Sequence, residues 1–372
     1  MATDKGFDVD KILRDCVRSV PTYTPGKSLE LIQKEFGLSS ITKLASNENP
    51  FGCPISSDEL SSALVGLYPD SVNTELLSQL SHKWGVPDTS FILGNGSDEI
   101  IQLLSLAFLN TGDEIITGEC TFSEYAFGAA LLDATTITVK MPDFRYSVSE
   151  ILTRTTDKTK LIYIPNPNNP TGTIITHDEL VLLLEKVPNH CLVIVDEAYF
   201  EYVSDAAYPD TISLISQFSN LMILRTFSKA YGLAAFRIGY GIADPSIIEV
   251  LHKVRQPFNV NGLALKAASL ALTKTDFLER TIAENDRGKT FFYQQLELLG
   301  LSFLPSHANF VFIHLPCEAS VVCDRLIHKG FAIRSMVSFG YPNAIRVSIG
   351  TQDQTLVFFK VFSEIIKELR NE

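Results

Sequence analysis

Short apolar runs alternate with amphipathic stretches along the first two thirds of the chain. Runs such as Ile162-Tyr163-Ile164 and Leu192-Val193-Ile194-Val195 are typical of strands that are buried on both faces. Between such runs, apolar residues recur every three or four positions, as at Leu76, Leu77 and Leu80, which is the spacing of an amphipathic helix. Strands that alternate with helices predict a mostly parallel central sheet with helices on both faces.

The pattern also predicts where the elements lie and how the chain divides. We expect strands at 91–93, 114–117, 135–140, 160–164, 191–195, 221–224 and 238–242, and helices at 8–20, 28–37, 73–84, 98–109, 123–132, 149–156, 177–186 and 211–218. The polar, turn-rich segments 44–52 and 67–70 are expected to be loops.

After about residue 255 the pattern changes to long helices over 262–298, strands at 308–313 and 344–349 around a helix at 319–328, and a final helix at 354–370. We therefore predict an α/β fold with a smaller α+β domain, divided into an N-terminal arm that joins the small domain (1–45), a large domain (46–255) and the small domain (256–372).

Composition and charge exclude several classes of protein. The net charge of −12, with no basic run, disfavours a nucleic-acid or anionic-membrane partner. The six cysteines are scattered and form no Cys-x-x-Cys pair, and the seven histidines lack metal-ligand spacing, so we expect reduced thiols and no metal site. Because the N-terminus lacks the apolar core of a signal peptide and no apolar run approaches a membrane span, we expect a cytoplasmic protein.

Polar and reactive side chains follow the predicted strands. Asn169 and Asp196 come just after two of them, and Lys229 follows the run Leu221-Met222-Ile223-Leu224. The segment 94–99 and Phe122 occupy the same position after earlier strands. Because ligands of parallel sheets bind beyond the carboxyl ends of the strands, these residues predict one shared site.

Two of these segments indicate specific chemistry, although each has a plainer interpretation. Lys229 lies among hydroxyls in a mostly apolar segment, which suits an amine that loses its charge for Schiff-base chemistry. It could equally cap the sheet edge or pair with a carboxylate. Gly94-Asn95-Gly96-Ser97-Asp98-Glu99 opens a helix and could bind an anion, yet any capped helix after a tight turn has a similar sequence.

Several motifs, in one order along nearly the whole chain, resemble the fold-type-I aminotransferases that depend on pyridoxal 5'-phosphate. They are Asn47-Glu48-Asn49-Pro50, Tyr68-Pro69, Gly94–Glu99, Asn169-Pro170-Thr171-Gly172, Asp196-Glu197-Ala198-Tyr199, Ser228-Lys229 with Arg237, and Arg346-Val347-Ser348-Ile349-Gly350. Within this superfamily the chain is most similar to the histidinol-phosphate aminotransferases. It departs from the usual pattern at Ser71, Cys120, Glu124 and Ala235-Phe236, and Glu124 and Ala235-Phe236 bear on pocket shape and hence on the substrate.

The resemblance implies that pyridoxal 5'-phosphate is the cofactor and that Lys229 carries it. Asp196 would pair with the protonated pyridine nitrogen, while Tyr199 and Asn169 would bond the ring's phenolic oxygen. Phe122 would stack on the ring. The phosphate group would lie against Ser97, Asp98, Glu99, Thr226, Ser228 and Arg237. Without the resemblance, Asp196 could be a helix N-cap, Phe122 a core aromatic and Arg237 part of a salt bridge between domains.

The resemblance also implies substrate residues and a partner. Arg346 and Arg334 would bind the phosphate of the donor and the carboxylate of the acceptor, with Tyr23 and Asn47 beside them. The preferred donor would be histidinol phosphate, with an aromatic amino acid as the alternative, and the acceptor would be a 2-oxo acid, 2-oxoglutarate by preference. Tyr68 would reach the cofactor phosphate of a second subunit, so we expect a homodimer with shared sites. From sequence alone, Tyr68 and Arg334 also fit exposed surface residues.

Two other functions remain open at this stage. A lyase on the same scaffold, such as a phosphothreonine decarboxylase, would use every one of these cofactor residues. A non-catalytic cofactor-binding module, of the kind fused to regulators, is a second alternative, although the chain lacks a basic helix-turn-helix extension.

Overall fold

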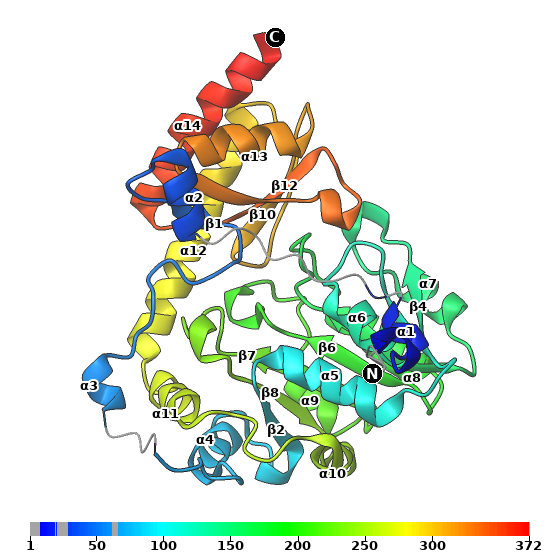
Figure 1. The fold of residues 1–372 in the computed structure, drawn as a ribbon. Helices are drawn as coiled ribbons and strands as arrows, with labels where there is room; N and C mark the ends of the chain where they lie inside the picture. Colours follow the sequence, from blue (N-terminus) through cyan, green and yellow to red (C-terminus); the bar gives the residue numbers. More distant parts are fainter. Residues whose placement is uncertain (1–7, 19, 21–28, 62–65, 372) are drawn as a thin grey trace, which may run out of the picture.

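The computed structural model describes residues 8–18, 20, 29–61 and 66–371, which form a seven-stranded sheet and a five-stranded sheet (Figure 1). The larger sheet has the order β2-β8-β7-β6-β5-β3-β4. Its strands are β2 (Phe91–Gly94), β3 (Glu114–Gly118), β4 (Thr135–Val139), β5 (Thr159–Pro165), β6 (Leu192–Asp196), β7 (Leu221–Thr226) and β8 (Gly239–Ala243). Neighbours from β4 to β7 pair in parallel, and β8 runs antiparallel to both β7 and β2. The predicted mostly parallel sheet is thus confirmed, with β8 as its one reversed strand.

Alternate residues of the central strands face opposite layers of helices. Leu161 and Tyr163 of β5 pack in one cluster with helices α5, α6 and α10, while Ile162 and Ile164 pack in the other with α7 and α8. Helices α4 and α11 cover the β2–β8–β7 side. Because both faces are covered, the strands are apolar throughout, which is why their sequences show runs and not alternation. The helices of this part are α3 (Ser57–Leu60), α4 (Thr74–Trp84), α5 (Ser97–Phe108), α6 (Glu124–Ala130), α7 (Val148–Arg154), α8 (His177–Lys186), α9 (Thr211–Ile215), α10 (Pro245–Val254) and α11 (Gly262–Ala271).

The smaller sheet lies above the larger one in Figure 1, and the long helix α12 (Thr275–Leu298) runs from the larger part up to it. Its order is β1-β11-β12-β10-β9. The strands are β1 (Thr42–Leu44), β9 (Phe303–Leu304), β10 (Phe310–His314), β11 (Phe331–Ser335) and β12 (Ala344–Ser348), and the helices are α2 (Leu29–Phe36), α13 (Ala319–His328) and α14 (Gln352–Asn371). Phe292 of α12 and Phe358, Phe359 and Phe362 of α14 form the core of this part with the sheet.

Some predicted elements are wrong. The segment 8–20 was expected to be one helix, but it contains a short 3-10 turn, Val9–Lys11, and a single helical turn α1, Asp15–Arg18. Ile12 between them is 71% exposed, so no apolar face stabilises a longer helix. Strands β1, β9 and β11 and helices α3 and α10 were not predicted, and the segment expected to be a loop from residue 44 overlaps the end of β1. Strands β1 and β9, with three and two residues, are too short to show a period in sequence.

Three further observations concern the described residues only. None of their helices has the length and apolar character needed to cross a bilayer. No disulfide joins cysteines within the described ranges. No group of three or more metal-ligating side chains gathers in that part of the chain.

Candidate active site

A cavity lies at the carboxyl ends of β5, β6 and β7. Its lining consists of Ser97, Asp98, Phe122, Tyr125, Pro165, Pro167, Asn169, Asp196, Ala198, Tyr199, Thr226, Ser228, Lys229 and Arg237. Every residue predicted to bind the cofactor lines it except Glu99 and Tyr68. Segments that are far apart in sequence therefore meet at one edge of the sheet, as expected of a parallel arrangement.

One end of the cavity is built to receive an anion. Helix α5 begins there at Ser97, so its first backbone N–H groups have no partner within the helix. Arg237 extends its guanidinium into the same place, with Nη1 3.2 Å from Ser228 Oγ and Nη2 2.9 Å from Asp98 Oδ2. Gly96 has φ +80°, and a Cβ there would lie 2.6 Å from Arg237 Nη2. Only glycine allows the arginine to approach the helix start so closely.

Asp196 contributes a buried carboxylate to the lining of the cavity. It is the last residue of β6 and is 5% exposed. Its Oδ1 accepts from the Ala198 N–H at 3.1 Å and its Oδ2 from the Tyr125 hydroxyl at 2.7 Å. Burial raises the pKa of Asp196 to about 6, and the hydrogen bond from Tyr125 acts in the opposite direction. A buried acid with an ionised form held by two donors is suited to bind a protonated ring nitrogen.

A buried ion pair fixes the strand ends behind this carboxylate. Glu197 and Arg225 are 0% and 2% exposed, and Arg225 Nη2 lies 2.7 Å from Glu197 Oε2. The guanidinium lies between the rings of Trp84 and Phe200, 4.1 and 4.0 Å from their centroids. Tyr208 donates to Glu197 Oε1 at 3.0 Å and also contacts the Asn166 carbonyl at the end of β5. The ends of β5, β6 and β7 are thus joined through one carboxylate.

Lys229 places its amine at the mouth of the cavity. Its Nζ donates to the Ser46 carbonyl at 3.1 Å and lies 5.7 Å from the centroid of the Tyr199 ring. Ser46 is a neutral acceptor, and the described residues give Lys229 no carboxylate partner. The interpretation of Lys229 as one half of an ion pair therefore does not fit its contacts among the described residues.

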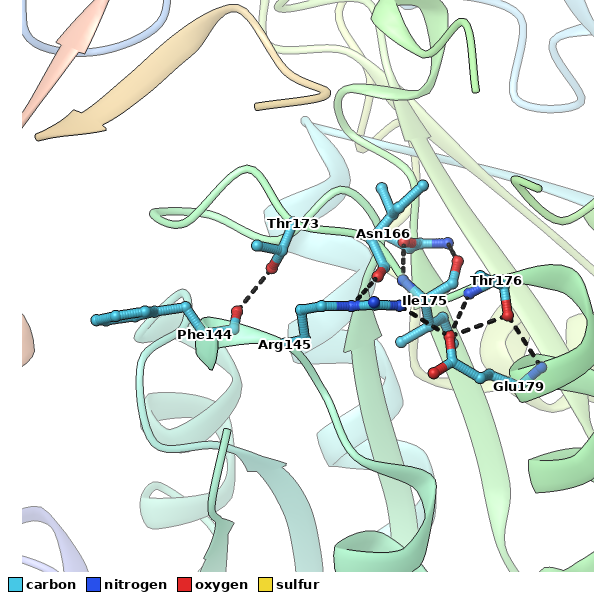
Figure 2. Close-up of polar contacts among 8 residues, drawn as sticks. Phe144, Arg145, Asn166, Thr173, Ile175, Thr176 and Glu179 are labelled. Carbon is cyan, nitrogen blue, oxygen red and sulfur yellow. Dashed lines mark hydrogen bonds and ion pairs between the residues drawn. The ribbon is translucent and has the colours of Figure 1, made fainter. Parts of the chain in front are cut away.

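Asn169 projects into the cavity from the loop after β5, and polar contacts anchor the return of that loop (Figure 2). Asn166 exchanges two hydrogen bonds with Ile175, of 3.3 and 3.0 Å. Arg145 donates to the Ile174 carbonyl and to the Glu179 carboxylate. The same carboxylate accepts from the Thr176 N–H at the start of helix α8. The loop that carries Asn169 is consequently fixed at its base.

Asn47 connects the smaller sheet to Tyr199. Its Nδ2 donates to the Tyr199 hydroxyl at 2.9 Å, and its Oδ1 accepts from Ser348 Oγ at 2.9 Å. The Asn47 N–H donates to the same Ser348 oxygen, also at 2.9 Å. Because Tyr199 accepts from Asn47, its own proton is available to donate into the cavity.

Two arginines lie side by side on β12 and β11. Arg346 and Arg334 are register partners in the small sheet. Arg346 is 6% exposed and donates to Asn169 Oδ1 and to the Ala45 carbonyl, the latter at 2.7 Å. Burial and the charge of Arg334 lower the pKa of Arg346 to about 10. An incoming anion would relieve both effects, so this pair is suited to bind a phosphate or carboxylate.

The remaining predicted residues lie elsewhere. Glu99 points away from the cavity, and its Oε2 accepts from Asn259 Nδ2 at 2.7 Å and from the Asn95 N–H at 2.5 Å. Its side chain thus supports the turn before α5 and does not line the cavity. Tyr68 is 82% exposed and stacks on Phe258 with ring centroids 4.7 Å apart. Tyr23 lies outside the described residues.

Tyr125 is the lining residue that the sequence did not suggest. It lies in the first turn of α6, three positions after Phe122, and both side chains line the cavity. Helical spacing from Phe122 could have identified it, but the Glu124–Tyr125 step resembles the beginning of an ordinary core helix.

Taken together, the residues present fit pyridoxal 5'-phosphate. The close approach of Gly96 and Arg237 and the start of α5 match a phosphate group, and Asp196 matches a pyridinium nitrogen. Asn169 and Tyr199 can both donate to the ring's phenolic oxygen, because other residues occupy their acceptor positions. Lys229 supplies the amine that would carry the group.

Comparison with known proteins gives consistent results. A sequence profile of the family "Aminotransferase class I and II" matches residues 39–360. The histidinol-phosphate aminotransferase of Bacillus subtilis subsp. natto is 40% identical, over 95% of this chain and 99% of the relative. That of Moorella thermoacetica is 41% identical, over 95% of this chain and 92% of the relative. The crystal structure of histidinol-phosphate aminotransferase from Sinorhizobium meliloti, in complex with pyridoxal-5'-phosphate, matches with a TM-score of 0.88 and 25% identity, and it covers 96% of this chain and 98% of that one.

Proposed function

This chain belongs to the class I and II aminotransferase family, and we propose that it transfers an amino group from histidinol phosphate to 2-oxoglutarate. The enzyme is a pyridoxal-phosphate-dependent transaminase. The observation that carries the choice of donor is the pair of arginines at Arg346 and Arg334, on neighbouring strands above the cofactor cavity. The names of the relatives described above support the same donor.

When bound, pyridoxal 5'-phosphate supplies an electrophilic carbon and an electron-withdrawing ring. We propose that Lys229 would carry it and that, once released, its Nζ would accept the proton that leaves the substrate carbon. Asp196 would hold a proton on the ring nitrogen, and Asn169 and Tyr199 would orient the ring through its phenolic oxygen. Ser97, Asp98, Thr226, Ser228 and Arg237 would bind the phosphate.

We propose that Arg346 binds the anionic group of each substrate in turn. Its guanidinium can form two parallel hydrogen bonds to a phosphate or carboxylate. Arg334 adds a second positive charge at the more exposed side, where a phosphate with two negative charges gains more than a carboxylate does. Asn47 would remain beside the substrate while it holds Tyr199.

A donor panel tests this proposal. The purified enzyme is assayed with histidinol phosphate, phenylalanine and tyrosine as donors and 2-oxoglutarate as acceptor, and kcat/KM is compared. We expect histidinol phosphate to be preferred by at least about tenfold, or about 1.4 kcal/mol. A tenfold preference for phenylalanine would replace the proposal with an aromatic transaminase. Release of carbon dioxide without need for a 2-oxo acid would replace it with a decarboxylase.

We also propose a homodimer with shared active sites. Leu67 and Tyr68, 68% and 82% exposed, border a hollow of about 690 Å³ together with Phe258 and Leu263. An exposed apolar and aromatic surface of this kind is typical of a protein interface. Tyr68 would contact the cofactor phosphate of the partner subunit.

Hybrid dimers test the sharing. A Tyr68→Phe chain mixed with a Lys229→Ala chain gives a hybrid in which, if Tyr68 acts in trans, one site carries both changes and the other carries neither. The hybrid would then retain one fully active site. If Tyr68 acts within its own chain, each site carries one of the two changes, and the hybrid has no fully active site. A monomer with full activity at working concentration would contradict the dimer itself.

The other expectations also stand as proposals. We propose division into an arm (1–45), a large domain (46–255) and a small domain (256–372), in line with the membership of β1 in the smaller sheet. We propose that the enzyme acts in the cytoplasm. We also propose that it has no nucleic-acid or anionic-membrane partner, because its net charge is −12 and it has no basic run.

A further inference from the structure

We infer that Tyr125 is a positioning residue for Asp196, because its hydroxyl holds the carboxylate ionised and aimed into the cofactor cavity. The inference rests on the proposed function, since it takes Asp196 as the partner of the cofactor's ring nitrogen. Helix α6, which carries Tyr125, would then contribute to the site as well as cover the sheet.

The geometry around Tyr125 fixes its hydroxyl in one place. The residue is 1% exposed, and its oxygen lies 2.7 Å from Asp196 Oδ2. Its ring stacks on Tyr163 with centroids 4.5 Å apart and planes 14° apart. Phe122 packs against the other part of the ring, edge-on at 5.6 Å and 82°. These two ring contacts hold the Tyr125 hydroxyl within hydrogen-bond distance of Asp196.

The hydrogen bond favours one ionisation state of Asp196. An ionised carboxylate only accepts hydrogen bonds, and the neutral phenol of Tyr125 and the Ala198 N–H both donate to it. Burial raises the pKa of the Tyr125 hydroxyl well above its usual value, so the tyrosine stays a donor. Burial also acts against the charge on Asp196, so a second donor is needed for the carboxylate to stay ionised near neutral pH.

Other charged groups near Asp196 do not supply that donor. The titratable and charged groups that face it are Asp98 from α5, Tyr125 from α6, Tyr163 from β5, the adjacent Glu197, and Tyr199, Lys229 and Arg237 across the cavity. Asp98 and Glu197 disfavour ionisation of Asp196. Lys229 donates to Ser46 and Arg237 to Asp98 and Ser228. Tyr125 is thus the side chain with a proton committed to Asp196.

Equilibrium binding to the apoenzyme tests the inference without reference to turnover. Pyridoxal 5'-phosphate is titrated into wild-type protein, Tyr125→Phe and Tyr163→Phe between about pH 5 and pH 8, and bound cofactor is followed by its absorption. Tyr163→Phe is the matched control, because it removes a hydroxyl from an equally buried ring in the same stack. The thermal unfolding midpoint of each apoenzyme confirms that all three are folded.

We expect Tyr125→Phe to bind the cofactor about tenfold more weakly at neutral pH, as expected for a lost hydrogen bond to a charged group. The pH at which affinity falls on the acid side should also move upward by about one unit, because Asp196 would protonate more readily. Tyr163→Phe should retain wild-type affinity, and its affinity should fall at the same acidic pH as that of the wild type. In an Asp196→Asn background, Tyr125→Phe should have no further effect, since no carboxylate remains to be held.

Three results would overturn the inference: Tyr125→Phe indistinguishable from wild type, equal losses in both phenylalanine variants, or an undiminished loss in the Asp196→Asn background. The second would show that ring packing alone matters. The proposed function fails in a different way, because wild-type protein would then bind no pyridoxal 5'-phosphate or catalyse no transamination.

Discussion

Replacement of Arg225 by methionine tests how the chain holds the carboxyl ends of β6 and β7 together. Arg225 and Glu197 are almost completely buried, and Arg225 donates to Glu197 Oε2 from Nε at 2.8 Å and from Nη2 at 2.7 Å. Methionine retains an unbranched apolar side chain between the rings of Trp84 and Phe200. It removes the positive charge and both donors, so the Glu197 carboxylate is left buried without a cation.

The magnitude follows from burial. Removal of one partner of a buried ion pair costs about 3–5 kcal/mol, because the other charge is left uncompensated. Loss of the contacts with two aromatic rings adds up to about 2 kcal/mol. In the double variant Arg225→Met/Glu197→Gln, the glutamine oxygen still accepts from Tyr208 and Thr211, each at 3.0 Å in the wild type, and no charge is buried. We expect the double variant to recover most of the loss and to remain within about 2 kcal/mol of wild type.

Guanidinium unfolding, followed by far-UV circular dichroism and by the fluorescence of the single tryptophan, gives the free energies. Lys253→Met is the control, because the Lys253–Glu249 pair is 67% and 78% exposed and should contribute less than about 1 kcal/mol. If the single and double variants lose equal stability, the uncompensated charge is not the cause and the reasoning is refuted. A loss below that of Lys253→Met would show that the pair contributes nothing.

Three further changes give distinct results. Lys229→Ala should abolish both turnover and the cofactor label that borohydride fixes on the protein, and a label on another lysine, located by peptide mapping, would contradict the assignment. Arg346→Ala should lower kcat/KM for donor and acceptor alike by about a hundredfold, or about 2.7 kcal/mol, as expected for a lost charge-assisted pair, whereas a loss confined to one substrate would show that the site is not shared. Burial raises the pKa of Glu201 from 4.5 to about 7, so the folded state binds the extra proton and the stability that this gives is lost as pH rises through about 7. Glu201→Gln should therefore raise the free energy of unfolding by about 1–3 kcal/mol near pH 8 and leave it unchanged near pH 4.5, and equal effects at both pH values would contradict this sign.

Much of the site could be predicted because parallel strands end at one edge of a sheet. Asn169, Asp196 and Lys229 each follow an apolar run, and the period of the pattern alone locates them together. The direction of the Glu99 side chain was not predicted, because its motif indicates only that a helix starts there. The direction of the Glu99 side chain depends on its hydrogen bond with Asn259, which is 160 positions away.

The contacts that tune the site could not be predicted. The Tyr125–Asp196 hydrogen bond and the Arg346–Asn169 hydrogen bond join segments 71 and 177 residues apart. No local period encodes such pairs, because they depend on how two layers come together in space. Strand β11 was missed because only its first residue, Phe331, is buried and Arg334 is exposed. Its sequence therefore shows no run of buried apolar residues and resembles that of a loop. Without β11, the pairing of Arg334 with Arg346 could not be seen.

The hydrogen bonds between Asn47 and Ser348 have a consequence for the order in which the protein is made. They connect residues 301 positions apart, and through Asn47 they hold the Tyr199 hydroxyl in place. A ribosome that adds about 5–20 residues per second needs on the order of 15–60 s between these two residues. During that time the nascent chain can already form its central sheet, while Tyr199 still lacks the Asn47–Ser348 contact that holds its hydroxyl. The Tyr199 hydroxyl is therefore fixed through Asn47 only after Ser348 has been made, and a chain released before Ser348 would carry the lining of the cavity without that contact.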